Sequence, residues 1–333
     1  MPKRTKSTQK KCLTLYIPDL FSALRRETAD LTYQHLAQLL SKAHIQPCLT
    51  GDGLTFLSSQ CAVSEHKLSR AALALHGAGK ATDSWVCYAT PVQMQANRDH
   101  LTIVQASDFD FDEGEGAAMC AEFNAHFSAD KIHFVYHHPG LFFCFSHKSV
   151  DVAACSPKDI IGHNLANHMP SGKGEMQVRQ WFNESQMLLH HSLSNRQRMI
   201  NGKAEINSLW FWGGGGLPEK FTLAYVQVFT NISEVAGFAR LGRARFDSLP
   251  SNLNAEHFTR DGNHFIYYEA LETPEALSLS DSYASRCLSL LKNKTIDEFR
   301  LIPEYGKQFI LTSRSLNKFW KATKPIDSFI CKP

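Results

Sequence analysis

The chain has 333 residues, 43% of them apolar and 20% charged, a length that suits two globular domains or one domain with a large insertion. Its 35 basic and 32 acidic residues leave a net charge of +3. This near balance excludes a protein whose main partner is nucleic acid or a membrane surface held by a strong positive field. We therefore predict neither of these partners.

The nine cysteines are scattered, form no C-x-x-C pair, and in several cases lie within apolar runs. Free, buried thiols of this kind indicate a reducing compartment, so we predict a cytoplasmic protein. Residues 1–11 carry the one basic run and lack the apolar stretch of a signal peptide. We expect a disordered leader there.

In chain order, a short apolar run predicts a buried strand over residues 12–17, which Pro18 ends. Leu36, Leu39 and Leu40 share one face of a helix expected over residues 33–43. Before residue 192 we further expect helices at 67–75, 116–127 and 175–191 and strands at 85–88, 101–104, 132–136 and 141–145. After residue 208 we expect strands at 209–212, 223–229, 264–269 and 308–311 and helices at 235–241 and 280–291. Strands that alternate with helices predict an α/β fold.

The most informative segment begins at Asn195 and ends at a run of four glycines. Its polar members are Asn195, Arg198 and Asn207. Its aromatic members are Trp210 and Trp212, which lie just before the glycine run Gly213, Gly214, Gly215 and Gly216. A tight turn needs one or two glycines, whereas a longer run lets the backbone approach a ligand or form an anion-binding nest. Arginine and asparagine donors suit a phosphate or a carboxylate. An equally weighted interpretation is that the tryptophans fill a core and the glycines form a hinge.

This segment resembles the archaeal-type, cofactor-independent phosphoglycerate mutases of the alkaline-phosphatase-like superfamily, in which N-x-x-R-x-x-x-G precedes N-x-x-W-x-W-G-x-G. It is even more similar to their bacterial relatives, the RpfE-type regulatory proteins. A weaker likeness begins near Thr90-Pro91-Val92 and includes the passage from Gly162 to Gly172. The resemblance covers about residues 85–218, which correspond to the inserted domain of the mutases.

The resemblance implies that Asn195, Arg198 and Asn207 help to hold a phosphosugar acid, with Trp210 and Trp212 as supporting packing. The chain departs from the family at Gly216, where the mutases commonly place an arginine. A phosphate site without that second fork of donors would be weaker or adapted to another ligand.

The mutases also use a serine or threonine nucleophile and two divalent metals held by aspartates and histidines. The nearest counterparts in this chain are Asp19, which lacks the following glycine of the family, and the pair Asp261 and His264. Asp-Gly-Asn before a strand is typical of an ordinary turn. We therefore predict no metal, no cofactor and no catalytic residue.

A second acidic element is the run Asp108, Asp110 and Asp112, which imitates the start of a calcium loop. Its sixth position is Glu113 and its twelfth is Met119, where such a loop needs glycine and glutamate. Capping of the following helix is the better interpretation.

Together these patterns predict a degenerate alkaline-phosphatase and phosphoglycerate-mutase-like core, formed by residues 12–84 and 219–333, with an inserted α/β domain at 85–218. We predict a non-catalytic regulatory or ligand-binding protein that binds a small anionic metabolite or a protein partner. The ligand-binding residues would be Asn195, Arg198, Asn207, Trp210, Trp212, Gly213, Gly214 and Gly215. An active metal-dependent mutase or phosphatase with rearranged ligands is the alternative, and a structural interaction module remains open.

Overall fold

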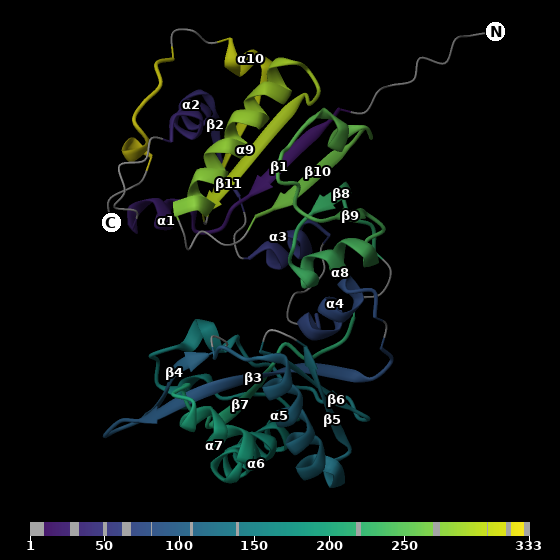
Figure 1. The fold of residues 1–333 in the computed structure, drawn as a ribbon. Helices are drawn as coiled ribbons and strands as arrows, with labels where there is room; N and C mark the ends of the chain where they lie inside the picture. Colours follow the sequence, from purple (N-terminus) through teal and green to yellow (C-terminus); the bar gives the residue numbers. More distant parts are fainter. Residues whose placement is uncertain are drawn as a thin grey trace, which may run out of the picture. The chain divides into compact units, whose positions relative to one another are not determined.

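The structure is a computed structural model that describes residues 10–26, 33–48, 52–61, 68–80, 82–106, 109–137, 140–217, 221–268, 274–304, 306–317 and 321–329. Most of the predicted leader lies outside these ranges. The chain divides into two compact units, each built around its own sheet (Figure 1). The first unit comprises residues 1–65 and 220–333, and the inserted second unit comprises residues 66–219. The insertion thus begins at His66, whereas the sequence analysis places its start at residue 85.

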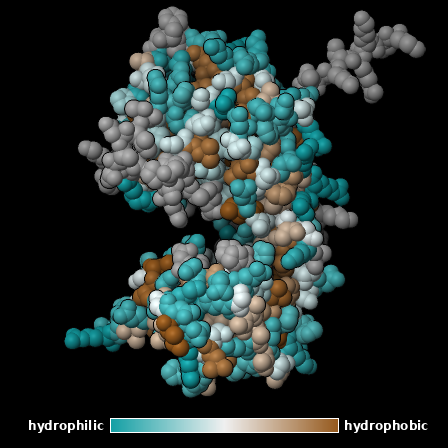
Figure 2. All heavy atoms as spheres, viewed as in Figure 1, coloured by the Kyte–Doolittle hydropathy of each residue, from teal (hydrophilic) through white to brown (hydrophobic). Residues whose placement is uncertain are grey.

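Hydrophilic residues dominate the visible surface of each unit, with separate hydrophobic spots between them (Figure 2). The larger apolar side chains that are exposed include Met176, Met187, Leu193 and Ile200, which all lie on two consecutive helices of the second unit. Among the described residues, no helix has both the length and the apolar character needed to cross a bilayer.

The first unit contains a seven-stranded sheet. In chain order its strands are β1 (Cys12–Tyr16), β2 (His44–Pro47), β8 (Tyr225–Phe229), β9 (Arg245–Asp247), β10 (Asn263–Tyr267), β11 (Glu298–Glu304) and β12 (Lys307–Thr312). They lie side by side in the order β2-β12-β11-β1-β10-β8-β9. The five strands from β11 to β9 are parallel, and β12 and β2 are antiparallel to their neighbours. β1 is therefore the central strand, between two strands from the C-terminal part of the chain.

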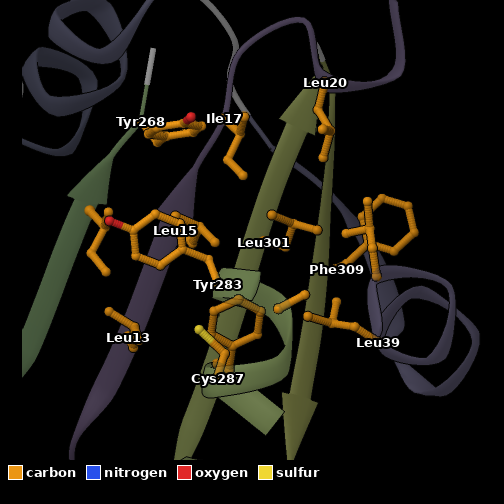
Figure 3. Close-up of a cluster of buried hydrophobic side chains, with 14 of the residues drawn as sticks. Leu13, Leu15, Ile17, Leu20, Leu39, Tyr268, Tyr283, Cys287, Leu301 and Phe309 are labelled. Carbon is orange, nitrogen blue, oxygen red and sulfur yellow. The ribbon is translucent and has the colours of Figure 1, made fainter. Parts of the chain in front are cut away.

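One face of this sheet packs against helices α1 (Leu20–Arg26), α2 (Gln34–Lys42) and α9 (Pro274–Lys292). Leu13 and Leu15 of β1, Leu301 of β11 and Phe309 of β12 point into this layer, where Cys287 of α9 joins them (Figure 3). These strand residues share one parity, because alternate side chains of a strand point to the same face.

The opposite face carries the alternate residues of each strand, such as Thr14 and Tyr16 of β1 and Phe265 of β10. Helices α3 (Gly53–Gln60) and α8 (Ser233–Leu241) belong to this unit as well. Phe56 of α3 stacks on Phe265 of β10 with ring centroids 5.7 Å apart, and its ring centroid lies 5.2 Å from that of Tyr16. Thr14 is also buried on this face, so β1 is covered on both sides.

The second unit has a five-stranded sheet made of β3 (Trp85–Ala96), β4 (Leu101–Ala106), β5 (Ile132–His137), β6 (Leu141–Ser146) and β7 (Ser208–Trp212). Its strands are antiparallel, and the long β3 pairs with β4, β6 and β7 along different parts of its length. Helices α5 (Glu113–His126), α6 (Glu175–His191) and α7 (Leu193–Ile200) complete this unit with α4 (Arg70–Gly77). Side chains of α5 and α6 pack with Trp85, Cys87 and Ala89 of β3, whereas α4 packs with Val86 and Tyr88.

Most predicted elements are present, and the helix over residues 175–191 has the predicted bounds. The helix expected at 280–291 begins earlier, at Pro274, and the strand expected at 85–88 continues to Ala96. Seven of the described helices and strands were missed: α1, α3, α7 and the short α10 (Ser313–Leu316), and the strands β2, β9 and β11. The omission of β11 had the largest consequence, because this strand lies beside β1 at the centre of the sheet.

Replacement of Leu301 by alanine should destabilise the first unit by about 2–5 kcal/mol, because this side chain is fully buried in the layer between β11 and α9. The measurement is urea denaturation followed by far-ultraviolet circular dichroism. As a control, Ile45→Ala on edge strand β2, where the side chain is 49% exposed, should cost less than about 1 kcal/mol. Equal losses in both variants would contradict the assigned core.

Candidate functional site

Arg198, the predicted anion donor, lies in the interior of the second unit with 1% of its surface exposed. All three nitrogens of its guanidinium group are bonded within the chain. Nε donates to the carbonyl of Ala204 at 3.1 Å, one terminal nitrogen pairs with the Glu115 carboxylate, and the other donates to the carbonyl of Phe109. The guanidinium carbon also lies 4.8 Å from the ring centroid of Phe111.

Lys203 completes this ion cluster, since its ammonium group lies 3.0 Å from the second oxygen of Glu115. Hydrogen bonding to Glu115 is the main reason why the Lys203 pKa is raised. The single carboxylate of Glu115 is thus shared between two cations. The cluster ties the end of α7 to the start of α5, which lies about 80 residues earlier in the chain.

Asn195 is buried as well and connects three segments. Its side-chain amide donates to the carbonyls of Leu189 and Ile206 at 3.2 and 2.9 Å, and its oxygen accepts from the Ile206 N–H at 3.1 Å. Its own N–H is bonded by the Ser192 hydroxyl, which caps α7. Asn195 therefore fixes the junction of α6, α7 and the chain that leads into β7.

Asn207 makes a two-way contact with the backbone of β3. Its amide donates to the Met94 carbonyl and its oxygen accepts from the Met94 N–H, both at 2.8 Å. These bonds continue the pairing of β7 with β3 beyond Ser208.

The two tryptophans have separate partners. The indole N–H of Trp210 donates to the Cys155 carbonyl at 3.0 Å, and that of Trp212 donates to the Thr90 hydroxyl at 2.8 Å. Trp210 is fully buried beside Phe182 of α6.

The glycine run packs against the start of α4 and against β3. The carbonyls of Gly213 and Gly216 accept from the N–H groups of Ala71 and Ser69 at 3.2 and 2.8 Å. Gly213 has a left-handed φ of 66°, and a Cβ on Gly214 would lie 2.4 Å from the Trp85 ring. Close packing thus accounts for glycine at these two positions.

The structure therefore brings the predicted ligand-binding residues together in one unit, and all of them except Gly215 have a packing or hydrogen-bond partner described there. Their role in ligand binding stays a prediction. The interpretation of the tryptophans as core residues agrees with their burial and hydrogen bonds.

The three candidates for metal ligands do not converge. β1 and β10 run parallel with Leu13 opposite His264, so His264 and Asp261 lie near the amino end of this strand pair. Asp19 follows the carboxyl end of β1, six residues beyond Leu13, which at about 3.3 Å per residue places it up to about 20 Å away. Asp261 instead forms an ion pair with Lys11 at 3.5 Å. Among the residues that the structure describes, no three His, Cys, Asp or Glu side chains are grouped so as to hold a metal ion.

The acidic run before α5 caps that helix, as predicted. Asp112 is the N-cap residue and its carboxylate accepts from the Glu115 N–H at 2.7 Å. Asp108 lies outside the described residues.

A polar pocket that the sequence analysis missed lies on the α3 side of the seven-stranded sheet. It has a volume of about 140 Å³, and its lining residues are Thr14, Cys48, Phe56, Gln60, Tyr225, Arg300, Ile302 and Gln308. Arg300 is its charged member, with its side chain 42% exposed and paired with Glu298. The pocket draws residues from four strands and one helix. One of those strands, β11, was not predicted, so nothing in the sequence indicated that its residues line a pocket.

Two groups at this pocket keep their protons at neutral pH. Burial raises the pKa of the Tyr225 phenol to about 12, although a hydrogen bond with Thr14 opposes the shift. Burial likewise raises the pKa of the neighbouring Cys12 thiol to about 11. Both groups therefore act as neutral donors beside Arg300.

Replacement of Arg198 by methionine should cost about 3–5 kcal/mol, because it removes one of the two cations that share the Glu115 carboxylate and leaves two carbonyls without their donor. Tryptophan fluorescence during urea unfolding reports on this unit, which contains Trp85, Trp181, Trp210 and Trp212. Arg196→Met, at an exposed position of the same helix, is the control and should change stability by less than about 0.5 kcal/mol. An Arg198→Met protein of unchanged stability would contradict the structural role.

His264 should make stability depend on pH. It is fully buried, its Nε2 is bonded to the Arg260 carbonyl, and burial lowers its pKa from the ordinary value of 6.5. Below pH 6.5 the imidazole of His264 binds a proton in the unfolded chain but stays neutral in the folded chain. The contribution of His264 to the free energy of unfolding is therefore complete above pH 6.5 and falls as the pH drops. The free energy of unfolding, measured with urea, should fall less between pH 7.5 and pH 5.5 in His264→Asn than in the wild type. His147→Asn, at an exposed site, should keep the wild-type loss.

Comparison with known proteins gives a local likeness in sequence and a global likeness in fold. No protein family matches the chain. Over 73 residues the chain is 37% identical to a probable 2,3-bisphosphoglycerate-independent phosphoglycerate mutase of Geobacter sulfurreducens. That stretch is 20% of this chain and 18% of the mutase, so it spans less than a fifth of the relative's length.

Among solved structures, the PH0037 protein of Pyrococcus horikoshii superimposes with a TM-score of 0.52 at 11% identity, over 91% of this chain and 88% of that one. A cofactor-independent phosphoglycerate mutase from Thermoplasma acidophilum gives a TM-score of 0.47 at 12% identity, with coverages of 96% and 94%. The predicted α/β fold class is confirmed: the chain has a sheet-centred α/β core with an inserted α/β unit, and its fold is similar to that of the PH0037 protein.

Proposed function

We propose that this chain is a non-catalytic binding protein with a regulatory role, built on a scaffold like that of the cofactor-independent phosphoglycerate mutases. The partner would be a small anionic metabolite or another protein, and the regulatory role is suggested by the resemblance of the sequence to the RpfE-type regulatory proteins. The observation that carries the non-catalytic part of the proposal is the complete internal bonding of Arg198, at a position where the resemblance to the mutases implies a contact with the phosphosugar acid.

The energetics of the Arg198 cluster support this proposal. For Arg198 to bind a phosphate, its guanidinium group would have to leave Glu115 and two backbone carbonyls in a buried environment. A buried ion pair that loses one partner costs about 3–5 kcal/mol. Such a cost would equal or exceed the gain from a new charged hydrogen bond, which contributes about 1.5–3 kcal/mol.

The positions of the acidic and histidine candidates also support it. Phosphoryl transfer with two metals needs several ligands at one rim, where the metals stabilise both the attacking and the leaving oxygen. Asp19 lies at one end of the strand pair β1 and β10, and Asp261 and His264 lie at the other. These three residues do not form a common site.

An active metal-dependent mutase or phosphatase is the second candidate. The local identity of 37% to a probable mutase favours it, since 73 aligned residues include more than a short motif. Under this alternative the metal ligands would come from positions other than those three residues.

The two candidates predict different results for 3-phosphoglycerate. The purified full chain, supplied with manganese, should neither convert this compound to 2-phosphoglycerate nor hydrolyse p-nitrophenyl phosphate above the rate of a blank. An established mutase run in parallel controls the assay. Turnover that depends on manganese and scales with protein concentration would refute the proposal and favour the enzyme.

A further inference from the structure

The polar pocket of the first unit begins with a row of side chains on neighbouring strands. Thr14 of β1 lies in register with Arg300 of β11, and Cys12 lies in register with Glu298. Because alternate residues share a face, these four side chains lie on the side of the sheet opposite α9. Tyr225 reaches the same place from β8, with its ring centroid 5.1 Å from that of Phe265 on the intervening strand β10.

Arg300 offers unused donors to this pocket. Its Nε and one terminal nitrogen both contact the same oxygen of Glu298, at 2.7 and 2.6 Å. Within the described part of the chain, its other terminal nitrogen has no hydrogen-bond partner. A guanidinium edge of this kind is a fixed fork that matches the two oxygens of a carboxylate.

Neutral polar groups surround this cation. Gln60 of α3 and Gln308 of β12 bring amide groups, Thr14 brings a hydroxyl, and Tyr225 brings a phenol that stays protonated. Phe56 and Ile302 supply the apolar part of the lining. This combination suits a small molecule that has one charged group and one or two hydroxyl or carbonyl groups.

The size of the pocket and the charges around Arg300 further restrict the class of ligand. A volume of about 140 Å³ suits a small organic molecule and exceeds the roughly 10–15 Å³ that one water needs by this measure. Glu298 already neutralises Arg300, so a ligand with two negative charges would meet a repelling carboxylate beside its partner. A single negative charge avoids most of this repulsion.

We propose that this pocket, centred on Arg300, binds a small carboxylate monoanion that carries a hydroxyl or keto group next to the carboxylate. The inference rests on the proposed binding role, for which it names a site and a ligand class. It places that site in the first unit, on residues that the resemblance to the mutases does not mark.

Isothermal titration calorimetry at constant ionic strength tests the proposal with four probes: sodium lactate, sodium glycerate, the neutral analogue lactamide and inorganic phosphate. Lactate or glycerate should bind saturably, and lactamide and phosphate should bind at least about tenfold more weakly, because a charged hydrogen bond is lost or a repulsion added. Absence of binding by both carboxylates, or equal binding of phosphate, would overturn the proposal.

Variants connect the binding to the pocket. Arg300→Gln should weaken carboxylate binding about tenfold or more. Arg245→Gln is the matched control, because Arg245 pairs with Asp247 two residues along a strand of the same sheet, as Arg300 pairs with Glu298. Tyr225→Phe keeps the ring and removes the hydroxyl, and it should weaken binding severalfold even if Arg300→Gln does not fold. Unchanged affinity in Tyr225→Phe and in folded Arg300→Gln, or equal loss in Arg245→Gln, would refute the site.

These outcomes are separate from those of the turnover assay. A wild-type protein that binds neither carboxylate and turns over nothing refutes the pocket and leaves the non-catalytic role standing. A protein that binds lactate through Arg300 and also converts 3-phosphoglycerate refutes the non-catalytic role and leaves the pocket standing.

Discussion

The first unit depends on the burial of β1 on both faces. Its odd-numbered side chains enter an aliphatic layer with α9, and its even-numbered side chains lie among aromatic and polar groups beside α3. A strand at the centre of a parallel sheet needs apolar groups on each side, yet β1 carries Thr14 in the middle of its second face. The hydroxyl of Thr14 is accommodated because Tyr225 and Arg300 stand beside it. The polar pocket is thus a direct result of how the centre of the sheet is covered.

Arg198 and Arg300 show that the role of an arginine depends on its surroundings. Arg198 has every nitrogen bonded and almost no exposed surface, so it joins α7 and the chain that follows it to α5 and the chain that precedes it. Arg300 is partly exposed, bonds Glu298 through one edge and directs the rest of its guanidinium group toward a pocket. The sequence motif drew attention to the first, whereas the ligand site that we propose is centred on the second.

Local patterns were sufficient where one element determines its own structure. Helix α6 was predicted with its observed bounds, and Asp112 was recognised as a cap, because both signals lie within a few residues. Arg198 was predicted as a free donor, since the residues that bond it, Glu115 and Phe109, lie more than 80 residues away. β11 was missed because charged residues and Pro303 interrupt its apolar alternation. β11 is stabilised by its pairing with β1, although its own sequence pattern does not indicate a strand.

The division of the first unit by a long insertion has a consequence for its synthesis. β1 leaves the ribosome well before its neighbours β10 and β11, which are made about 250 or more residues later. At about 5–20 residues per second, Leu13 and Leu15 remain unpaired for roughly 10–50 seconds. The strands of the inserted unit pair only within that unit. Its synthesis ends at residue 219, before β10 is made. Nascent chains stalled before residue 263 should therefore present the apolar β1 to chaperones while the inserted unit resists proteolysis.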